Sequence, residues 1–402
     1  MSILENFAEN ALQSMREKHI YRKLHLMVSP ESAHVQMANE DGLKENILLA
    51  SNSYLDLANI FELKQAMANA VLEWGTGSGG ARLTTGNKTP HLELENEIAK
   101  FKNEEAAITF GTGYMANVGT ISALCTKNDI IFSDALNHAS IIDGIRLSRA
   151  KCYVYKHNDL EDLKRLFAEA VNANGEKLGT GSVRGLIVTD AVFSMDGDLA
   201  NLPELLKIAH ENGVLLMIDE AHATGVVGKT GRGLAEYYGS EHADVTVGTL
   251  SKAVACEGGF VAGKKLLIEF LKNKARSFIF TTAMSPAVAF AACNNLRYIE
   301  NHPDCVQKLQ SNVKFFCEAL QKFGLDVPQV PSAIVPIMVG DEEKALQLSS
   351  KLEKEGILIP AIRYPTVPEG CARLRASLMA SHTEEDLEFA ARKIAETLRN
   401  LG

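Results

Sequence analysis

Short apolar runs alternate with helical stretches from about residue 47 to residue 285, and this alternation is the feature that most constrains the fold. The runs have the length of buried strands and are Ile47-Leu48-Leu49, Ala106-Ala107-Ile108, Ile130-Ile131-Phe132, Cys152-Tyr153-Val154, Leu186-Ile187-Val188, residues 214–218 and residues 243–247. Such alternation is typical of a mostly parallel sheet with helices on both faces. The sequence therefore predicts an α/β fold.

The two ends of the chain show other patterns. Residues 2–20 carry apolar side chains at helical spacing, which predicts an amphipathic arm that packs on the main body or on a partner subunit. Beyond Pro286, long helical stretches precede strand candidates at 334–339 and 373–378, and Thr383 begins a capping box for a final helix. We therefore expect an N-terminal helical arm at 1–46, a large α/β domain at 47–285 and a smaller C-terminal α+β domain at 286–402.

Composition narrows the classes of partner. The net charge is −9, from 41 basic and 50 acidic residues without a basic block, so nucleic acid is not an expected partner. The seven cysteines form no CxxC pair and no HExxH set occurs, which predicts reduced thiols and no metal. The N-terminus carries acid where a signal peptide carries base, and no apolar run approaches the roughly 20 residues that span a bilayer. We expect a soluble, cytoplasmic protein.

Three side chains near the middle of the chain suggest a cofactor. Asp219 directly follows the apolar run 214–218, His222 comes three residues later, and Lys252 follows the run 243–247 through Gly-Thr-Leu-Ser. Ligands in open α/β sheets bind outside the carboxyl ends of the strands. Pyridoxal phosphate needs a lysine for its aldehyde, an aspartate for its pyridine nitrogen and ring contacts. Each residue alone is more typical of a structural role, but together they predict an enzyme that acts on amino acids.

Two glycine loops have different contexts. Gly113 and Tyr114 lie between a strand and a helix, where backbone amides can hold a phosphate, although an ordinary strand-to-helix turn has the same appearance. The segment 75–80 matches G-x-G-x-x-G but follows a helical stretch, so a dinucleotide site is disfavoured there. It is better interpreted as a flexible glycine turn near the active site.

Two further residues follow predicted strands. His138 begins a helix and can stack on a pyridine ring, while the alternative is a helix cap with an incidental imidazole. Ser194 places a hydroxyl at another strand end, where a turn rich in Gly and Asp would look similar. Both are therefore candidate cofactor contacts.

The motifs together resemble those of the α-oxoamine synthase family of fold-type I pyridoxal phosphate enzymes, over nearly the whole chain. The matching segments are Ser51-Asn52-Ser53-Tyr54-Leu55, Gly77-Ser78-Gly79-Gly80, Leu136-Asn137-His138-Ala139-Ser140, Val192-Phe193-Ser194-Met195-Asp196-Gly197, Asp219-Glu220-Ala221-His222 and Gly248-Thr249-Leu250-Ser251-Lys252. The resemblance implies a fold-type I transferase with pyridoxal 5'-phosphate as cofactor and a homodimer with shared active sites.

The resemblance also implies roles for individual residues. Lys252 would form the imine and act as base, Asp219 would face the pyridinium nitrogen, and His138 would stack on the ring. Other cofactor contacts would be Ser194 and His222 at the ring hydroxyl, Gly113, Tyr114 and Thr249 at the phosphate, and Thr281 and Thr282 across the dimer interface. The implied substrate contacts are Arg22, Thr366 and Arg375, the last as a bidentate carboxylate clamp.

The segment from Ala361 to Arg375 is similar to that of the oxononanoate branch of the family, with Tyr364 where proline is more usual. This similarity implies condensation of L-alanine with pimeloyl-CoA, or its acyl-carrier-protein equivalent, with loss of CO₂, in biotin biosynthesis. The alternatives are an α-oxoamine synthase that uses glycine or serine with another acyl-CoA, a fold-type I aminotransferase, and a scaffold without activity.

Overall fold

The computed structural model describes residues 2–17, 20–21, 24–39, 42–179 and 182–401. In this part of the chain the largest sheet has seven strands, in the order β4 (Ala106–Phe110), β10 (Gly259–Gly263), β9 (Val245–Thr249), β8 (Leu215–Asp219), β7 (Gly185–Asp190), β5 (Ile130–Asp134) and β6 (Lys151–Tyr155). Strand β10 is antiparallel to both of its neighbours, and the other adjacent pairs are parallel. This is the mostly parallel sheet that the alternation predicted.

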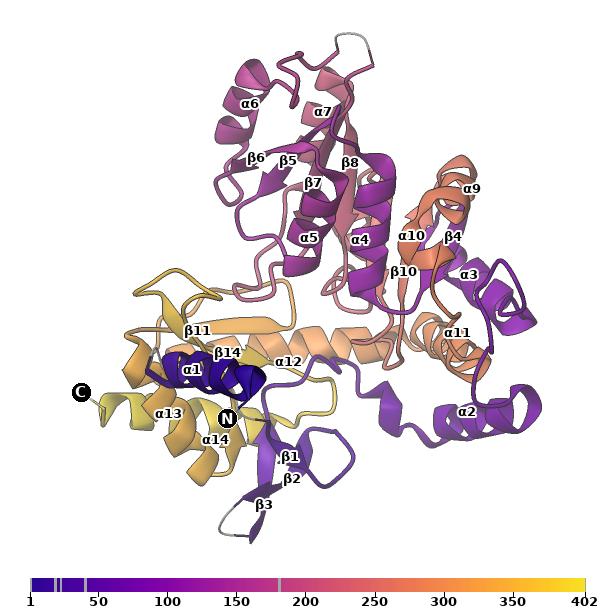
Figure 1. The fold of residues 1–402 in the computed structure, drawn as a ribbon. Coiled ribbons are helices and arrows are strands. Elements are labelled where there is room, and N and C mark those ends of the chain that lie inside the picture. Colours follow the sequence, from indigo (N-terminus) through magenta and orange to yellow (C-terminus); the bar gives the residue numbers. More distant parts are fainter. Residues whose placement is uncertain (1, 18–19, 22–23, 40–41, 180–181, 402) are drawn as a thin grey trace.

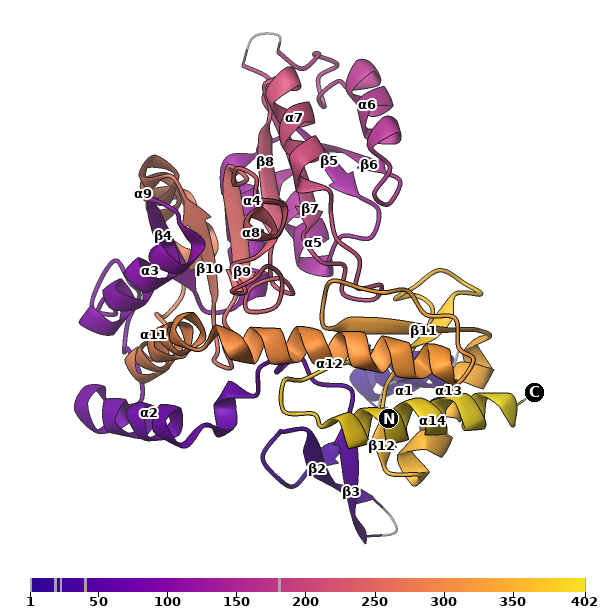
Figure 2. The ribbon, with the colours of Figure 1, turned by 180° about the vertical axis from the view of Figure 1, so that it is seen from behind.

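Helices cover both faces of the large sheet because its strands are apolar on both sides. In β7, Leu186 and Val188 belong to one core with α4 (Gly113–Leu124) and α5 (Ala139–Ser148), whereas Ile187 faces the other core. Figure 1 shows α4 and α5 in front of the sheet, and Figure 2 shows the opposite face. The helices that contribute to the second core include α3 (Thr89–Lys102), α6 (Leu160–Glu169), α7 (Leu202–Asn212) and α8 (Leu234–Tyr238).

The long helices lie beyond the large sheet and beside two smaller sheets (Figure 2). One small sheet has the order β1 (Leu26–Met27), β2 (His34–Asn39), β3 (Gly42–Leu48) and β12 (Ile357–Leu358), and the other has the order β11 (Ile334–Gly340), β14 (Ala372–Ser377) and β13 (Ala361–Ile362). Apart from the N-terminal helix, the other helices of the described residues are η1 (Leu57–Asn59), α2 (Phe61–Trp74), α9 (Lys265–Lys274), α10 (Arg276–Ile279), α11 (Pro286–Asn301), α12 (Pro303–Lys322), α13 (Glu342–Lys354) and α14 (Glu384–Arg399).

Two sequence expectations about strands need correction. Ile47-Leu48-Leu49 was expected in the large sheet, but β3 pairs with β2 and β12 in a small sheet. The sequence pattern also missed β10, whose five residues begin and end with glycine. The capping box is present, because Thr383 accepts from the Asp386 amide while Asp386 accepts from the Thr383 amide. The division into 1–46, 47–285 and 286–402 stays a proposal.

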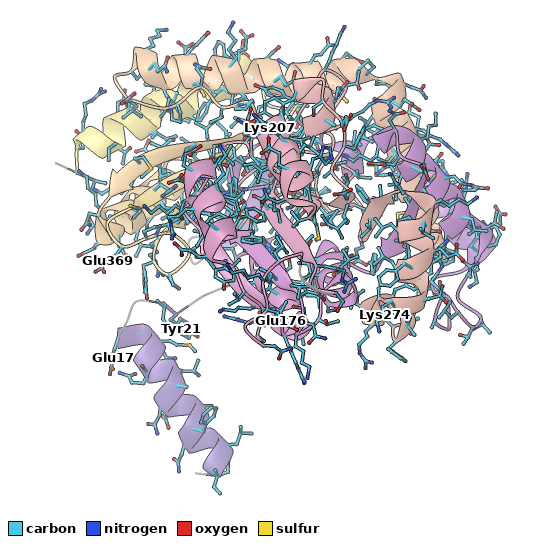
Figure 3. The ribbon with its side chains drawn as sticks, turned by 90° about the horizontal axis from the view of Figure 1, so that it is seen from above. Glu17, Tyr21, Glu176, Lys207, Lys274 and Glu369 are labelled. Atoms are coloured by element: carbon cyan, nitrogen blue, oxygen red, sulfur yellow. The ribbon has the colours of Figure 1, made fainter. Side chains whose placement is uncertain are left out.

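Helix α1 (Ile3–Glu17) forms where the helical spacing predicted it, but it does not pack on the main body. None of its residues is buried, and Ile3, Leu4 and Phe7 are 91%, 73% and 72% exposed. Figure 3 shows α1 standing apart from the rest of the ribbon. Its apolar face is therefore without a partner among the described residues. No helix in the described ranges combines the length and the apolar character needed to cross a membrane.

Candidate active site

The parallel strands bring polar residues together at one edge of the large sheet. Asp190 at the end of β7 lies opposite Asp219 at the end of β8, and Asp219 is paired in turn with Val247 of β9. The segments that follow these strands surround a cavity of about 270 Å³. The cavity is lined by Thr112, Gly113, Tyr114, Asn117, His138, Ser140, Asp190, Ser194, Asp219, Ala221, His222, Thr249, Ser251 and Lys252. It thus collects most of the cofactor contacts that the sequence predicted.

The amine of Lys252 lies at the base of this cavity. Its Nζ is 2.8 Å from Nε2 of His222, and burial lowers the pKa of Lys252 to about 8 despite the nearby charges of Asp219 and Asp190. A neutral amine is a nucleophile and a base, whereas an ammonium ion is neither. Lys252 is therefore suited to both roles near neutral pH.

The buried imidazole of His222 connects Lys252 to Tyr54. Nδ1 of His222 is 2.6 Å from Oη of Tyr54, whose hydroxyl also lies 3.1 Å from Oδ1 of Asn52. Burial lowers the pKa of His222 well below its ordinary value, and the nearby cation of Lys252 adds to this effect. His222 is thus a neutral ring that accepts from Lys252 at Nε2 and donates to Tyr54 at Nδ1.

The carboxylate of Asp219 is buried and held by two donors. The amide of Ala221 donates to Oδ1 over 2.9 Å, and Nδ2 of Asn117 donates to Oδ2 over 2.6 Å. Both carboxylate oxygens of Asp219 therefore act as hydrogen-bond acceptors. A negative carboxylate in the cavity wall can hold a proton on a heteroaromatic nitrogen.

His138 is the N-cap residue of α5 and keeps one face open to the cavity. Its backbone amide donates to Oδ2 of Asp190 over 2.7 Å, which fixes the start of the helix. Burial lowers the pKa of His138, with the charge of Asp219 opposing and that of Lys252 reinforcing the shift. A neutral imidazole in this place can lie against a flat ring.

The start of α4, which also lines this cavity, is suited to an anion. Gly113 and Tyr114 are the first residues of α4, so their amides have no partner within the helix. A Cβ atom at Gly113 would lie 3.1 Å from Cβ of Thr249, which explains why glycine is needed for this close approach. The hydroxyl of Thr249 is 2.7 Å from that of Ser251. Free amides at a helix start and clustered hydroxyls form a phosphate site.

A second cavity of about 460 Å³ adjoins the first through Ser194, which lines both. Thr366 and Tyr364 lie in its wall, together with apolar residues of the Phe193 loop. Arg375 is buried nearby, where Nε donates to the Ser194 carbonyl, Nη1 to Ser377 over 2.6 Å and Nη2 to Asn52 over 3.1 Å. Arg375 also hydrogen-bonds to the hydroxyl of Tyr54, and it is not among the residues that line either cavity.

Two of the expected site residues, Thr281 and Thr282, line neither of these cavities. Thr281 and Thr282 lie in a separate small pocket, which Arg82 and Phe278 also line. Thr282 is exposed, and its neighbour Phe280 is 70% exposed. Arg22 lies outside the described residues.

Four further residues are buried at the site without a sequence signal for their role, namely Asn117, Ser140, Asp190 and Tyr54. Tyr54 and Ser140 stand within motifs that carried the resemblance, so their positions were signalled although their contacts were not. Asn117 lies in a helix whose neighbours are mostly apolar, and nothing in its local pattern distinguishes it.

The donor set fits pyridoxal phosphate. An amine, a buried carboxylate, a flat neutral ring and a phosphate-type helix start surround one cavity, and a Cβ at Gly113 would crowd it. Pyridoxal phosphate uses each of these features.

Comparisons with known proteins agree with this geometry. The family model described as aminotransferase class I and II matches residues 44–394. The chain is 45% identical to an 8-amino-7-oxononanoate synthase of Lysinibacillus sphaericus, over 97% of each protein. Among solved structures, a serine palmitoyltransferase of Sphingomonas wittichii has a TM-score of 0.91 at 30% identity, covering 100% of this chain and 99% of that one.

An 8-amino-7-oxononanoate synthase of Francisella tularensis has a TM-score of 0.74 at 33% identity, covering 88% of this chain and 98% of that one. These similarities extend over nearly the whole chain and include the segments that carry the site. The chain therefore belongs to the class I and II aminotransferase family and, within it, to the α-oxoamine synthases, which are fold-type I, pyridoxal phosphate-dependent C-acyltransferases.

Proposed function

We propose that this enzyme condenses L-alanine with pimeloyl-CoA, or with pimeloyl-acyl-carrier-protein, to form 8-amino-7-oxononanoate, free thiol and CO₂ in biotin biosynthesis. The observation that carries the proposal is the single cavity in which Lys252, Asp219 and His138 meet beside the Gly113 helix start. The relatives named 8-amino-7-oxononanoate synthase support the choice among α-oxoamine synthases.

The residues divide the work as follows. Bound pyridoxal phosphate supplies an electron-withdrawing ring that stabilises negative charge at the α carbon of the amino acid. Lys252 would hold the cofactor through its amine and would act as the base for the α proton. Asp219 would keep a proton on the pyridine nitrogen, and His138 would support the ring. Ser194 and His222 would contact the ring hydroxyl, while Gly113, Tyr114 and Thr249 would hold the phosphate.

The second cavity provides the site for the acyl chain. Its wall contains Thr366 and Tyr364, and Ser194 links it to the first cavity. We assign Thr366 to a substrate contact there and Arg375 to the carboxylate of the amino acid, and we keep Arg22, which lies outside the described residues, as a proposed substrate contact. A guanidinium can grip such a carboxylate with two parallel hydrogen bonds.

A homodimer completes the site. Thr281 and Thr282 are separated from the cavity of their own chain, so we assign them to the phosphate in the second subunit. The apolar side chains of Phe280 and Leu83 are 70% and 59% exposed. Such exposure supports the proposal that a second subunit covers them. The apolar face of α1 is a further candidate for the same contact. We place the dimer in the cytoplasm.

A substrate panel followed by thiol release tests the proposal. Alanine with pimeloyl-CoA and alanine with pimeloyl-acyl-carrier-protein should release thiol, and product mass should equal that of the amino ketone after loss of CO₂. Glycine with acetyl-CoA is the matched comparison pair. Activity with that pair and none with alanine and either pimeloyl thioester would reject the assignment.

A second candidate is condensation of serine with a long-chain acyl-CoA, which the fold similarity to serine palmitoyltransferase favours. Serine with palmitoyl-CoA therefore belongs in the panel. Keto-acid exchange without thioester consumption would identify an aminotransferase instead. Protein that remains colourless after addition of pyridoxal phosphate would identify a scaffold without activity.

A further inference from the structure

A hydrogen-bond chain connects the carboxylate of Asp219 to the imidazole of His138. Nδ2 of Asn117 lies 2.6 Å from Oδ2 of Asp219 and 2.9 Å from Oγ of Ser140. The same Oγ lies 2.7 Å from Nδ1 of His138, and the Ser140 amide donates to that Nδ1 over 3.2 Å. Asn117 and Ser140 are each 1% exposed. This hydrogen-bond chain thus runs along the wall of the cavity, through two buried side chains.

The carboxylate of Asp219 determines which atom of Asn117 faces it. Asp219 accepts from the Ala221 amide at its other oxygen, and the carboxylate oxygen that faces Asn117 likewise takes a donor. The amide oxygen of Asn117 would repel Asp219 in the reversed orientation. The NH₂ group therefore points at both Asp219 and Ser140.

The remaining atom of Asn117 supports this orientation. Its Oδ1 is buried and has no hydrogen-bond partner among the residues that the structure describes. In the reversed orientation Oδ1 could accept from the hydroxyl of Ser140, which would satisfy it. The folded structure leaves Oδ1 of Asn117 without a hydrogen bond and directs Nδ2 at Asp219. A buried carboxylate without a donor costs more free energy than a buried amide oxygen without one.

The same reasoning determines which atom donates in the contact between Ser140 and His138. Because Oγ of Ser140 accepts from Asn117, its own hydrogen is available for Nδ1 of His138. Nδ1 also caps α5 by accepting the Ser140 amide, and the positive end of the helix dipole disfavours a cation at this place. Nδ1 therefore acts as an acceptor, and the ring proton is left on Nε2.

We propose that Asn117 and Ser140 are positioning residues that hold His138 as the neutral imidazole with its proton on Nε2. The inference rests on the proposed place of His138 beside the cofactor ring. A neutral imidazole there leaves the positive charge on the pyridine nitrogen opposite Asp219, whereas an imidazolium would repel that charge. The Nε2 proton also gives the cavity a donor of fixed direction.

Other charged groups face His138 from the packed elements. Asp219 on β8 favours the protonated ring and Lys252 after β9 opposes it, while Asp190 on β7, whose own pKa is raised by burial, accepts the backbone amide of His138. His222 lines the same cavity and is neutral. The hydrogen-bond chain through Asn117 opposes protonation of His138, as Lys252 does, because donors to Nδ1 stabilise the unprotonated ring.

Nitrogen NMR of the full-length protein labelled with ¹⁵N at histidine tests the proposal, with and without bound pyridoxal phosphate. The chain has 11 histidines, and the signal lost in His138→Gln assigns the ring. We expect an unprotonated Nδ1 and a protonated Nε2 in the wild-type protein. Ser140→Ala and Asn117→Ala should each raise the pKa of His138 and populate the Nδ1-H form, while Ser140→Thr should retain the wild-type signals.

Two control variants separate this effect from lost stability. Ser148→Ala removes a buried hydroxyl from the same helix, and Asn312→Ala removes a buried amide that donates to backbone carbonyls. Neither should move the His138 signals. Protonation of Nδ1 in the wild-type protein, or unchanged signals in both Ser140→Ala and Asn117→Ala, would overturn the proposal. The wild-type result decides even where variants fail to fold, and it is independent of which thioester is the substrate.

Discussion

The amine of Lys252 and the imidazole of His222 are in direct contact, with Nζ and Nε2 2.8 Å apart. His222 is fixed on its other side by Tyr54, so the amine rests on a ring that cannot turn freely. The contact holds Lys252 in the cavity before any cofactor arrives. It also means that the reactivity of Lys252 depends on a neutral His222.

Replacing Lys252 with alanine removes both the imine and the proposed base. We expect turnover to fall by at least about 10³-fold, in line with the loss of a positioned base. Thiol release and the visible absorption of bound cofactor measure the two effects. Lys207→Ala, which changes an exposed lysine on α7, should leave both unchanged. Retained turnover in Lys252→Ala would contradict the assignment.

The pKa of Lys252 predicts how cofactor binding varies with pH. Burial lowers this pKa to about 8, so the reactive neutral amine becomes the main form above about pH 8 rather than above 10.5. The rate of imine formation with added pyridoxal phosphate should therefore rise with pH and level off above a midpoint near 8. Stopped-flow absorbance on cofactor-stripped protein measures it. A midpoint near 10.5 would show that Lys252 is not desolvated.

His157 joins the loops that carry His138 and Ser194. Nδ1 lies 3.0 Å from Asp134 and Nε2 lies 2.9 Å from Asp198. Burial opposes the charge on the ring, but hydrogen bonds to the two carboxylates outweigh it and raise the pKa of His157 to about 10. Because the folded pKa exceeds that of the unfolded chain, the stabilisation is complete below about pH 6.5 and is lost as pH rises towards 10.

His157→Gln should therefore cost about 2 kcal/mol of unfolding free energy at pH 6, the range for charged hydrogen bonds, and much less at pH 10. Chemical denaturation at the two pH values measures the difference. His210→Gln, which alters an exposed histidine on α7, serves as the control. A loss of equal size at both pH values would mean that His157 acts by packing rather than by charge.

Lys102 and Glu220 form a buried ion pair next to Asp219. Nζ of Lys102 is 2.6 Å from Oε2 of Glu220, and the two side chains are 1% and 7% exposed. Lys102→Met leaves the carboxylate of Glu220 buried without its partner, which should cost about 3–5 kcal/mol of unfolding free energy. Denaturant titration measures this cost, and adding Glu220→Gln should recover part of it.

The neighbouring Lys100 provides the matched control for this prediction. It pairs with Glu97 and Glu300, but its side chain is 62% exposed, so solvent weakens both pairs. Lys100→Met should have a much smaller effect on unfolding. Equal losses in Lys100→Met and Lys102→Met would show that burial does not determine the strength of the pair.

The sequence was sufficient for the features that depend on local pattern. Buried parallel strands are continuous apolar runs, so β5 to β9 could be recognised, and the residues after them had to lie at one edge of the sheet. This is why Asp219, Lys252 and His138 could be placed together. The capping box at Thr383 followed from the same kind of local rule.

Features that depend on pairing between distant segments could not be predicted. Strand β10 is short and glycine-rich, and it is stabilised by hydrogen bonds to β4 and β9 on both sides. The register of β3 with β12 likewise has no local signal. Asn117 contributes through Asp219 and Ser140, which are 102 and 23 residues away in sequence, so its role requires the folded structure.

The parallel pairing of Ile47 with Ile357 has a consequence during synthesis of the chain. The N-terminal strands leave the ribosome early, but the segment that completes their sheet is translated about 310 residues later. Until then the edge of β3 has no strand to pair with. Premature release of nascent chains should therefore leave these strands open to association with one another.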